Sequence, residues 1–285
     1  MRVLVTGHKG YIGTVMTPLL LEAGHEVVGL DSDLYRRCTY PAGGRIADVA
    51  MIEKDTRDIE LEDVEGFDAV IFLAALSNDP LGNLNPGMTY EINHAAPMRA
   101  ATLAKKAGVK RFLFASSCSN YGSGSGDAML DETAPLAPVT PYGAAKVKAE
   151  IEMAALEAPM EAVSNEAFNV GQSAHNYRIR ELAEIVASVV PGCRIEIAAG
   201  AGPDTRNYRV SCEKIRRVLP AFQPQWDARK GAEQLYAAYS SSALELGEFE
   251  GPRYQRIAHI EKLLAEGILG SGLRGRVAAE ASAVA

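Results

Sequence analysis

The segment Val5–Gly13 constrains the fold most, because Gly7, Gly10 and Gly13 stand between a short aliphatic run and a helical pattern. Glycine is needed where a turn takes positive φ, where backbone approaches a pyrophosphate, and where a helix packs closely on a strand. The N-terminus of the following helix offers free N–H groups and partial positive charge to phosphates. The pattern predicts a dinucleotide-binding turn, and a purely structural turn is the alternative.

Asp31 supports the first interpretation. It ends the second aliphatic run, at the place where an acid accepts hydrogen bonds from the adenosine ribose. A carboxylate there repels a 2′-phosphate, so NAD is expected rather than NADP. A solvated aspartate is the alternative.

The first half of the chain alternates short hydrophobic runs with helical patterns, which predicts an α/β fold with a doubly wound parallel sheet of the Rossmann type. Residues 1–165 are expected to form the NAD-binding domain, and residues 166–285 a smaller C-terminal substrate lobe and tail. The expected strands are Arg2–Thr6, His25–Leu30, Val49–Lys54, Phe67–Ala74 and Arg111–Ser116. The expected helices are Tyr11–Ala23, Met88–Ala107 and Tyr142–Leu156.

The second half is less regular. Short strands are expected at Glu166–Val170 and Arg194–Ile197, with a further short segment at Arg206–Val210. The expected helices are Ile179–Val190, Ser211–Leu219, Ala228–Tyr239 and Tyr254–Glu266.

Composition excludes several classes of protein. The net charge of -7 argues against a nucleic-acid partner. The four cysteines form no CxxC pair and the five histidines show no ligand spacing, so neither a disulfide framework nor a metal site is expected. Because no apolar run approaches the roughly 20 residues of a membrane span, and no signal peptide is evident, a cytoplasmic location is expected.

Tyr142 and Lys146 lie four residues apart at the start of a predicted helix, which places both side chains on one face. A nearby ammonium favours the phenolate and lowers a tyrosine pKa toward neutrality. Ser117, at the end of the fifth expected strand, could hold a substrate oxygen while Tyr142 exchanges its proton. A solvated surface pair is the alternative.

Six patterns together resemble the extended short-chain dehydrogenase/reductase family, in the branch that acts on nucleotide-activated sugars. They are Thr6–Gly13, Asp55-Thr56-Arg57-Asp58, Leu73-Ala74-Ala75, Asn93, the Ser116–Gly122 segment, and Tyr142 with Lys146.

The resemblance implies a role for each pattern. Asp55 contacts the adenine amine, Leu73–Ala75 passes under the cofactor, and Asn93 supports the active site. Ser117, Tyr142 and Lys146 are the expected catalytic residues, with Lys146 also binding a ribose. The expected cofactor-binding residues are Gly7, Gly10, Tyr11, Ile12, Gly13, Asp31, Asp55, Thr56, Leu73, Ala74, Ala75, Asn93, Tyr142 and Lys146.

The implied activity is NAD-dependent epimerisation of a nucleotide sugar by transient oxidation at a ring hydroxyl. The dehydratase branch carries Asp and Glu where this chain has Cys118 and Ser119, which argues against a 4,6-dehydratase. A ketoreductase is the enzymatic alternative, and an NAD-binding member that has lost catalysis is the other. The family also implies a homodimer.

The resemblance breaks down after the Tyr142 helix. Glu166–Val170 resembles the family's seventh strand, so several tens of residues are missing before it; taking it as the sixth strand is the alternative. We hypothesise that it docks beside the Arg111–Ser116 strand in the vacated place. The substrate-binding candidates are Ser77, Asn78, Ser119 and Arg206. For Ser77 and Asn78 the alternative is a loop built from turn-forming residues. For Arg206 it is a surface ion pair with Asp204.

Overall fold

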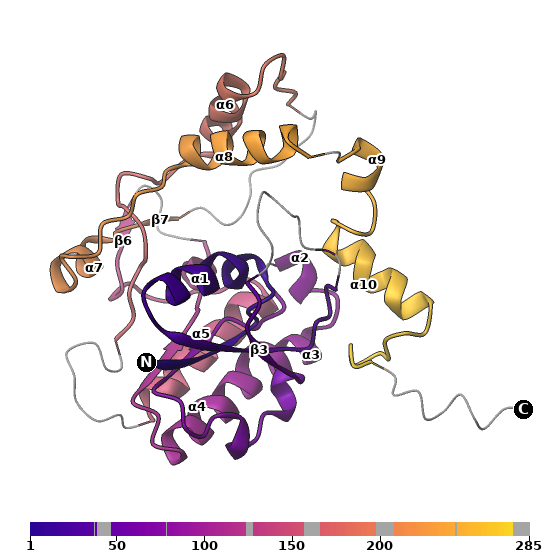
Figure 1. The fold of residues 1–285 in the computed structure, drawn as a ribbon. Coiled ribbons are helices and arrows are strands. Elements are labelled where there is room, and N and C mark those ends of the chain that lie inside the picture. Colours follow the sequence, from indigo (N-terminus) through magenta and orange to yellow (C-terminus); the bar gives the residue numbers. More distant parts are fainter. Residues whose placement is uncertain are drawn as a thin grey trace, which may run out of the picture. The chain divides into compact units, whose positions relative to one another are not determined.

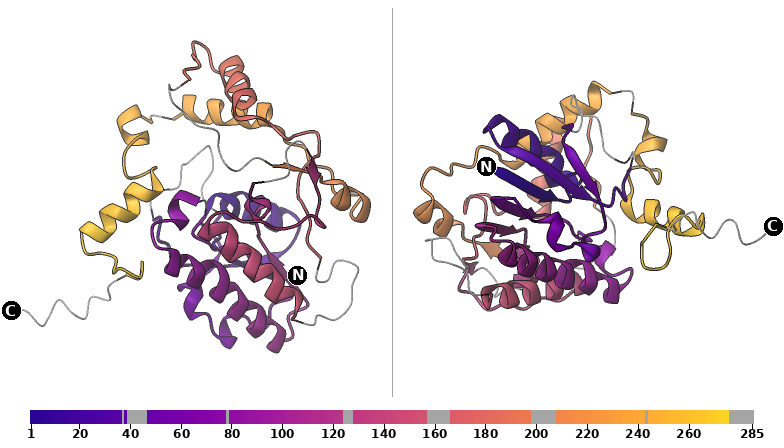
Figure 2. Two further views of the ribbon diagram at one scale, coloured as in Figure 1. Left: turned by 180° about the vertical axis from the view of Figure 1, so that it is seen from behind. Right: turned by 60° about the horizontal axis from the view of Figure 1, so that its bottom comes forward.

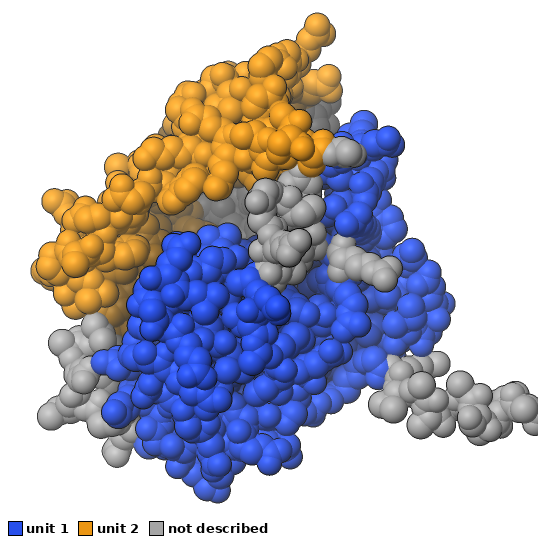
Figure 3. Space-filling view, in the orientation of Figure 1, with its two compact units in different colours: residues 1–41, 45–115, 244–285 blue, residues 42–44, 116–243 orange. Residues whose placement is uncertain are grey.

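The structure is a computed structural model that describes residues 1–36, 38, 47–77, 79–123, 128–156, 166–197, 208–242 and 244–275. The chain divides into two compact units, coloured separately in Figure 3. The first unit comprises residues 1–41, 45–115 and 244–285, and the second comprises residues 42–44 and 116–243. The division expected from the sequence, at residue 165, concerns cofactor and substrate roles and stays a prediction.

A parallel sheet forms the centre of the first unit (Figure 1). Its strands are β1 (Arg2–Thr6), β2 (Glu26–Asp31), β3 (Ala50–Glu53), β4 (Ala69–Phe72) and β5 (Arg111–Phe114). They lie in the order β3-β2-β1-β4-β5, and every neighbouring pair is parallel. From β1 the chain adds β2 and β3 on one side, and then returns to add β4 and β5 on the other side. This is the doubly wound arrangement, so the predicted fold class is confirmed.

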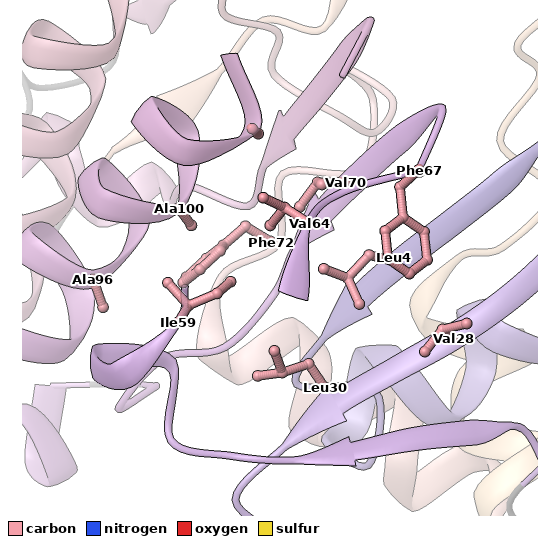
Figure 4. Close-up of a cluster of buried hydrophobic side chains, with 11 residues drawn as sticks. Leu4, Val28, Leu30, Ile59, Val64, Phe67, Val70, Phe72, Ala96 and Ala100 are labelled. Atoms are coloured by element: carbon pink, nitrogen blue, oxygen red, sulfur yellow. The ribbon is translucent and has the colours of Figure 1, made fainter. Parts of the chain in front are cut away.

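Helices cover both faces of this sheet. On one face Leu4, Leu30 and Phe72 pack with Ala100 of α4 (Ala96–Lys106), as Figure 4 shows. On the other face the small aliphatic residues of β1 and β4 pack against Met16 and Leu20 of α1 (Tyr11–Glu22). Because both faces are buried, β1 and β4 read as continuous apolar runs in the sequence.

The helix expected at Met88–Ala107 is interrupted. It begins as α3 (Pro86–Tyr90), passes through a π-helical turn, η3 (Glu91–Ala95), and continues as α4. A π turn inserts one residue into the helical repeat and often marks a functional position. Here it contains Asn93, whose side chain is fully buried.

The last described segment of the chain, residues 244–275, belongs to the first unit. It contains α9 (Leu246–Phe249) and α10 (Arg256–Ala265). Ile260 of α10 is fully buried against Leu76, Leu81 and Met88, close to the short helix α2 (Asp79–Gly82). Two 3-10 turns, η1 (Thr56–Asp58) and η2 (Leu61–Asp63), also belong to this unit.

The second unit holds shorter elements. Met129–Leu130 (β6) pairs in parallel with Arg209–Val210 (β7), and α6 packs against α8 (Figure 2). Its helices are the 3-10 turn η4 (Cys118–Tyr121), α5 (Pro141–Ala154), α6 (Ile179–Val189), α7 (Glu213–Val218) and α8 (Ala228–Ser240).

Two sequence predictions in this unit are wrong. Glu166–Val170, which the structure describes completely, is not a strand, so the hypothesis that it joins the sheet beside β5 fails. Its Asn169 instead bonds non-strand partners: the Asn169 N–H donates to Glu132 at 2.6 Å and its side chain pairs with the Tyr121 hydroxyl at 3.0 Å. Arg194–Ile197 also forms no strand; every residue in it is exposed.

Within the ranges described, no helix combines the length and apolar character required to cross a bilayer.

Candidate active site

The glycine turn lies against the end of β4. Gly7 has φ of 72°, and a Cβ placed on it would approach the Ala74 nitrogen to 2.8 Å. A Cβ on Gly13 would lie 2.5 Å from the Gly7 oxygen. Larger residues therefore cannot replace either glycine without moving backbone. Gly10 is the N-cap of α1, and no side chain among the described residues caps that helix.

The carboxylate of Asp31 is fixed by two backbone groups. Its Oδ2 accepts a hydrogen bond from the Lys9 N–H at 3.1 Å, and its Oδ1 accepts from the Asp33 N–H at 2.9 Å. The side chain keeps 16% of its surface exposed. Asp31 thus ties the glycine turn to the loop after β2 while presenting an anchored acceptor.

Asp55 is held by its neighbour Arg57. The Arg57 N–H donates to Oδ1 at 2.9 Å and its Nη2 donates to Oδ2 at 2.6 Å. Burial alone would raise the pKa of Asp55, but the hydrogen bonds from Arg57 outweigh it and lower the pKa below its ordinary value. The carboxylate is therefore ionised at neutral pH, next to the buried Thr56.

The segment Leu73–Ala75 is held from both sides. The Ala74 N–H donates to Thr6 Oγ1 at 3.3 Å. Asn93 accepts from the Leu76 N–H at 2.9 Å and donates to the Leu76 carbonyl at 3.0 Å. Asn93 therefore anchors the backbone that follows β4.

These features of the first unit fit a dinucleotide. The uncapped helix N-terminus suits a pyrophosphate, the anchored acceptor Asp31 suits a ribose, and Gly7 and Gly13 allow the tight backbone packing that forms the turn between them. The side chains of Tyr11 and Ile12 are 66% and 58% exposed at the start of α1.

The second unit carries the predicted catalytic residues on two adjoining elements, η4 and α5, which pack together. Ser117 is the N-cap of η4, and its Oγ accepts from the Ser119 N–H at 3.1 Å. Thr140 caps α5 by accepting from the Gly143 N–H at 3.2 Å. Tyr142 and Lys146 follow in the first turns of that helix.

Lys146 is buried, with 2% of its surface exposed. Burial lowers the pKa of Lys146 to about 7, against the opposing effect of the Glu150 carboxylate, which raises it. The ammonium therefore loses its proton within the neutral range.

Cys118 flanks Ser117 and is a poor acid or base. Burial and the nearby Glu150 raise the pKa of its thiol. The four cysteines, all within the described residues, are free.

Sequence reasoning missed a chain of part-buried hydrogen bonds in this unit. Asn120 donates one bond to Ser116 Oγ and one to Glu150 Oε1, both at 3.1 Å. Glu150 follows Lys146 by one helical turn, so its position on the Lys146 face was available from the spacing. Nothing local indicated its partner.

The predicted residues thus fall into two groups. The first unit holds the glycine turn, Asp31, Asp55, Thr56, Leu73–Ala75, Asn93 and the half-buried Ser77; the second holds Ser117, Ser119, Tyr142 and Lys146. Asn78 and Arg206 lie outside the described residues. Within the described ranges, no cluster of three or more His, Cys, Asp or Glu side chains is placed to hold a metal ion.

Comparison with known proteins identifies the family. Residues 3–190 match the family described as "NAD dependent epimerase/dehydratase family". A UDP-glucose 4-epimerase of Streptomyces lividans is 30% identical over 203 residues, which are 68% of this chain and 61% of the relative. A UDP-glucose 4-epimerase of Corynebacterium glutamicum is 28% identical, over 70% of this chain and 60% of the relative. The chain thus spans about three-fifths of these relatives.

The fold is also found in a solved structure, titled "Crystal Structure of UDP-galactose 4-epimerase". The TM-score is 0.66 at 21% identity, covering 86% of this chain and all of the other. Together with the glycine turn and the parallel sheet, the match over residues 3–190 shows that the chain belongs to the NAD dependent epimerase/dehydratase family, which confirms the predicted fold and the predicted cofactor, NAD.

Proposed function

We propose that this chain is an NAD-dependent epimerase that inverts a hydroxyl-bearing carbon of a nucleotide-activated sugar. One observation carries the proposal. Lys146 lies one turn from Tyr142 on α5, and burial lowers the pKa of Lys146 to about 7. A lysine that titrates near neutral pH beside a tyrosine is suited to assist proton transfer at the tyrosine hydroxyl. The curated relatives, named UDP-glucose 4-epimerases, support the same reaction class.

The chain's own residues manage the proton. The phenolate of Tyr142 removes the proton from the sugar hydroxyl, and returns it when the carbonyl is reduced. A positive charge on Lys146 favours the phenolate form of Tyr142. Ser117, fixed by its bond to the Ser119 N–H, orients the reacting oxygen. Bound NAD would supply the reversible hydride transfer that this oxidation and the following reduction of the sugar carbon require.

The first unit supplies the proposed cofactor site. Backbone N–H groups of Gly10, Tyr11 and Ile12 would hold the pyrophosphate, and Asp31 would accept from the adenosine ribose. Asp55 and Thr56 would hold the adenine, while Asn93 keeps the Leu73–Ala75 segment in place through Leu76. Ser77, Asn78, Ser119 and Arg206 are the residues proposed to contact substrate.

The test begins with the purified full chain and UDP-glucose or UDP-galactose. We expect the two nucleotide sugars to interconvert without net use of NAD. Chromatographic separation with detection by mass spectrometry measures this interconversion. Tyr142→Phe should lower kcat by roughly 10² to 10⁴ while NAD still binds, because only the proton transfer is removed. Tyr236→Phe, on α8, is the matched control and should retain activity.

Other outcomes would replace the proposal. Stoichiometric oxidation of added NADH or NADPH with a keto-sugar would identify a ketoreductase. Bound NAD with no conversion of any tested nucleotide sugar, and no effect of Tyr142→Phe, would identify a family member without catalysis. The test for a member without catalysis is informative because the chain spans only about three-fifths of the length of these relatives.

We further propose a cytoplasmic homodimer. Free thiols at all four cysteines fit a reducing compartment. The exposed Ile151 on α5 fits a helix face that is covered by a second copy. Light scattering on the eluted protein, with Ile151→Glu as the disrupting variant, measures the mass; an unchanged monomer mass for both would contradict the dimer.

A further inference from the structure

The loop after β2 holds a second acid besides the one expected from the motif. Asp33 lies two residues beyond Asp31, and its side chain is 9% exposed. It accepts bonds from Lys9 Nζ at 2.8 Å and from Arg36 Nε at 2.9 Å. Lys9 comes from the glycine turn, so this carboxylate joins two cations that come from different loops.

Asp33 and Asp31 share one corner of the fold. The Lys9 N–H and the Asp33 N–H both donate to the Asp31 carboxylate. The side chains that Asp33 holds therefore stand beside the acid that fits the adenosine ribose. Burial alone would raise the pKa of Asp33, but the bonds from Lys9 and Arg36 prevail and lower it, so both ion pairs persist at neutral pH.

This arrangement bears on cofactor choice. Lys and Arg side chains are the usual partners of a phosphate, and Arg binds it through two parallel N–H groups. Lys9 and Arg36 could supply such donors next to Asp31. As folded, both are engaged by Asp33, and Arg36 also contacts Glu53 at 3.2 Å in an exposed pair.

We propose that Asp33 is a cofactor-specificity residue, which engages Lys9 and Arg36 and so withholds them from the 2′-phosphate of NADP. Asp31 repels the 2′-phosphate directly, and Asp33 removes the cations that could offset this repulsion. Among the described side chains that these contacts join, three acids, Asp31, Asp33 and Glu53, outnumber the cations Lys9 and Arg36, so this group carries a formal charge of -1. The proposal rests on dinucleotide binding at the glycine turn and not on the sugar reaction.

Asp33→Asn is the appropriate change. Asp33 has φ of 50°, a left-handed conformation that Asn tolerates as readily as Asp, and Asn keeps the side chain's size while removing its charge. The formal charge of this described group then rises from -1 to zero, and both cations lose the carboxylate that they share.

The experiment measures equilibrium binding of NADH and NADPH to the full chain, freed of any bound nucleotide, by calorimetry. We expect Asp33→Asn to tighten NADPH binding by about tenfold or more, with NADH changing less than about threefold. Adding Arg36→Ala or Lys9→Ala to this variant should remove most of the gain. Raising the salt concentration should also reduce it, since the new contacts are ionic.

Glu26→Gln is the matched control, because Glu26 is also the carboxylate of an ion pair, with Arg2, but lies at the start of β2. It should leave the NADH-to-NADPH ratio unchanged. The same ratio in Asp33→Asn as in the unaltered chain, with NADH still bound, would overturn the proposal. Because the readout is binding, failure of sugar conversion would count against the proposed epimerase alone.

Discussion

Asn120 in η4 and Glu150 on α5 share a hydrogen bond of 3.1 Å, which joins the two elements that carry the proposed catalytic residues. The other N–H of the Asn120 amide bonds Ser116, the neighbour of Ser117. Glu150 also acts on Lys146, since burial lowers the pKa of that ammonium and the Glu150 carboxylate raises it. One carboxylate therefore positions the serine turn and partly offsets the effect of burial on the pKa of the lysine.

Glu150→Gln should move the basic limb of the activity profile to lower pH. Removing the carboxylate takes away the charge that raises the pKa of Lys146, so the ammonium is lost at lower pH and Tyr142 loses its support. Gln can still accept from Asn120, so the fold should persist. The profile of kcat/KM against pH measures the shift. Asn120→Ala, which keeps the charge, is the control; an equal shift in both variants would contradict the electrostatic role.

Lys146→Met should stabilise the protein while abolishing turnover. In the folded chain the pKa of Lys146 is about 7, below its ordinary value of 10.5, so the unfolded chain binds more protons between these values. The free energy of unfolding should therefore rise with pH from about 7 to about 10.5.

Methionine removes the cost of burying the charge, and we expect the free energy of unfolding to rise by about 1–3 kcal/mol at pH 7. Urea unfolding at pH 6, 7 and 9 measures both the gain and the loss of this pH dependence. Lys148→Met, on the same helix but 55% exposed, should change stability by less than about 0.5 kcal/mol. Destabilisation by Lys146→Met would show that the buried ammonium contributes net stability.

Gly7→Ala and Gly24→Ala form a matched pair. Both glycines have positive φ, 72° and 79°, so alanine is strained by about 1 kcal/mol at either position. Only at Gly7 would the new methyl group meet backbone, 2.8 Å from the Ala74 nitrogen, whereas nothing lies within 4 Å at Gly24. We expect Gly7→Ala to cost about 3 kcal/mol or more and to abolish NAD binding, as calorimetry and urea unfolding can measure. Equal losses of stability and of NAD binding in the two variants would contradict the close approach of Gly7 to the Ala74 backbone.

Asn93→Ala should lower stability by about 2–3 kcal/mol, because it leaves the buried N–H and carbonyl of Leu76 without their partner. It should also weaken NAD binding, since Leu73–Ala75 precedes Leu76 directly. Asn85→Ala removes the N-cap of α3 and should cost about 1 kcal/mol without changing the affinity for NAD. An unchanged affinity for NAD in Asn93→Ala would show that the π turn does not support the cofactor site.

Much of the first unit could be predicted from the sequence because its signals are local. β1, the glycine turn and α1 follow one another along the chain, and the predicted helix Tyr11–Ala23 differs from α1 by one residue. The π turn around Asn93 could not be found in this way. A single inserted residue barely changes an apolar pattern that continues on both sides.

The error at Glu166–Val170 has a different cause. A short apolar run favours a strand, but whether a strand forms depends on hydrogen-bond partners that come from residues far along the chain. Here the partners of Asn169 are Tyr121, Glu132 and Ser211.

The proposed site shows the same limit. The four-residue spacing was enough to single out Tyr142 and Lys146, whereas the bond between Asn120 and Glu150 joins residues 30 positions apart. Lys9, Asp33 and Arg36 are ordinary surface-type residues in the sequence. Only the folded loops show that one carboxylate holds both cations.

Residues 244–275 return to the first unit, where Ile260 is fully buried and Arg274 pairs with Asp58. During synthesis the ribosome must therefore finish α10 before the nucleotide-binding unit can close its core around Leu76, Leu81 and Met88. Until then the nascent chain exposes that apolar surface for the whole time in which the second unit is made, so this protein should depend on chaperones early and acquire resistance to proteolysis late.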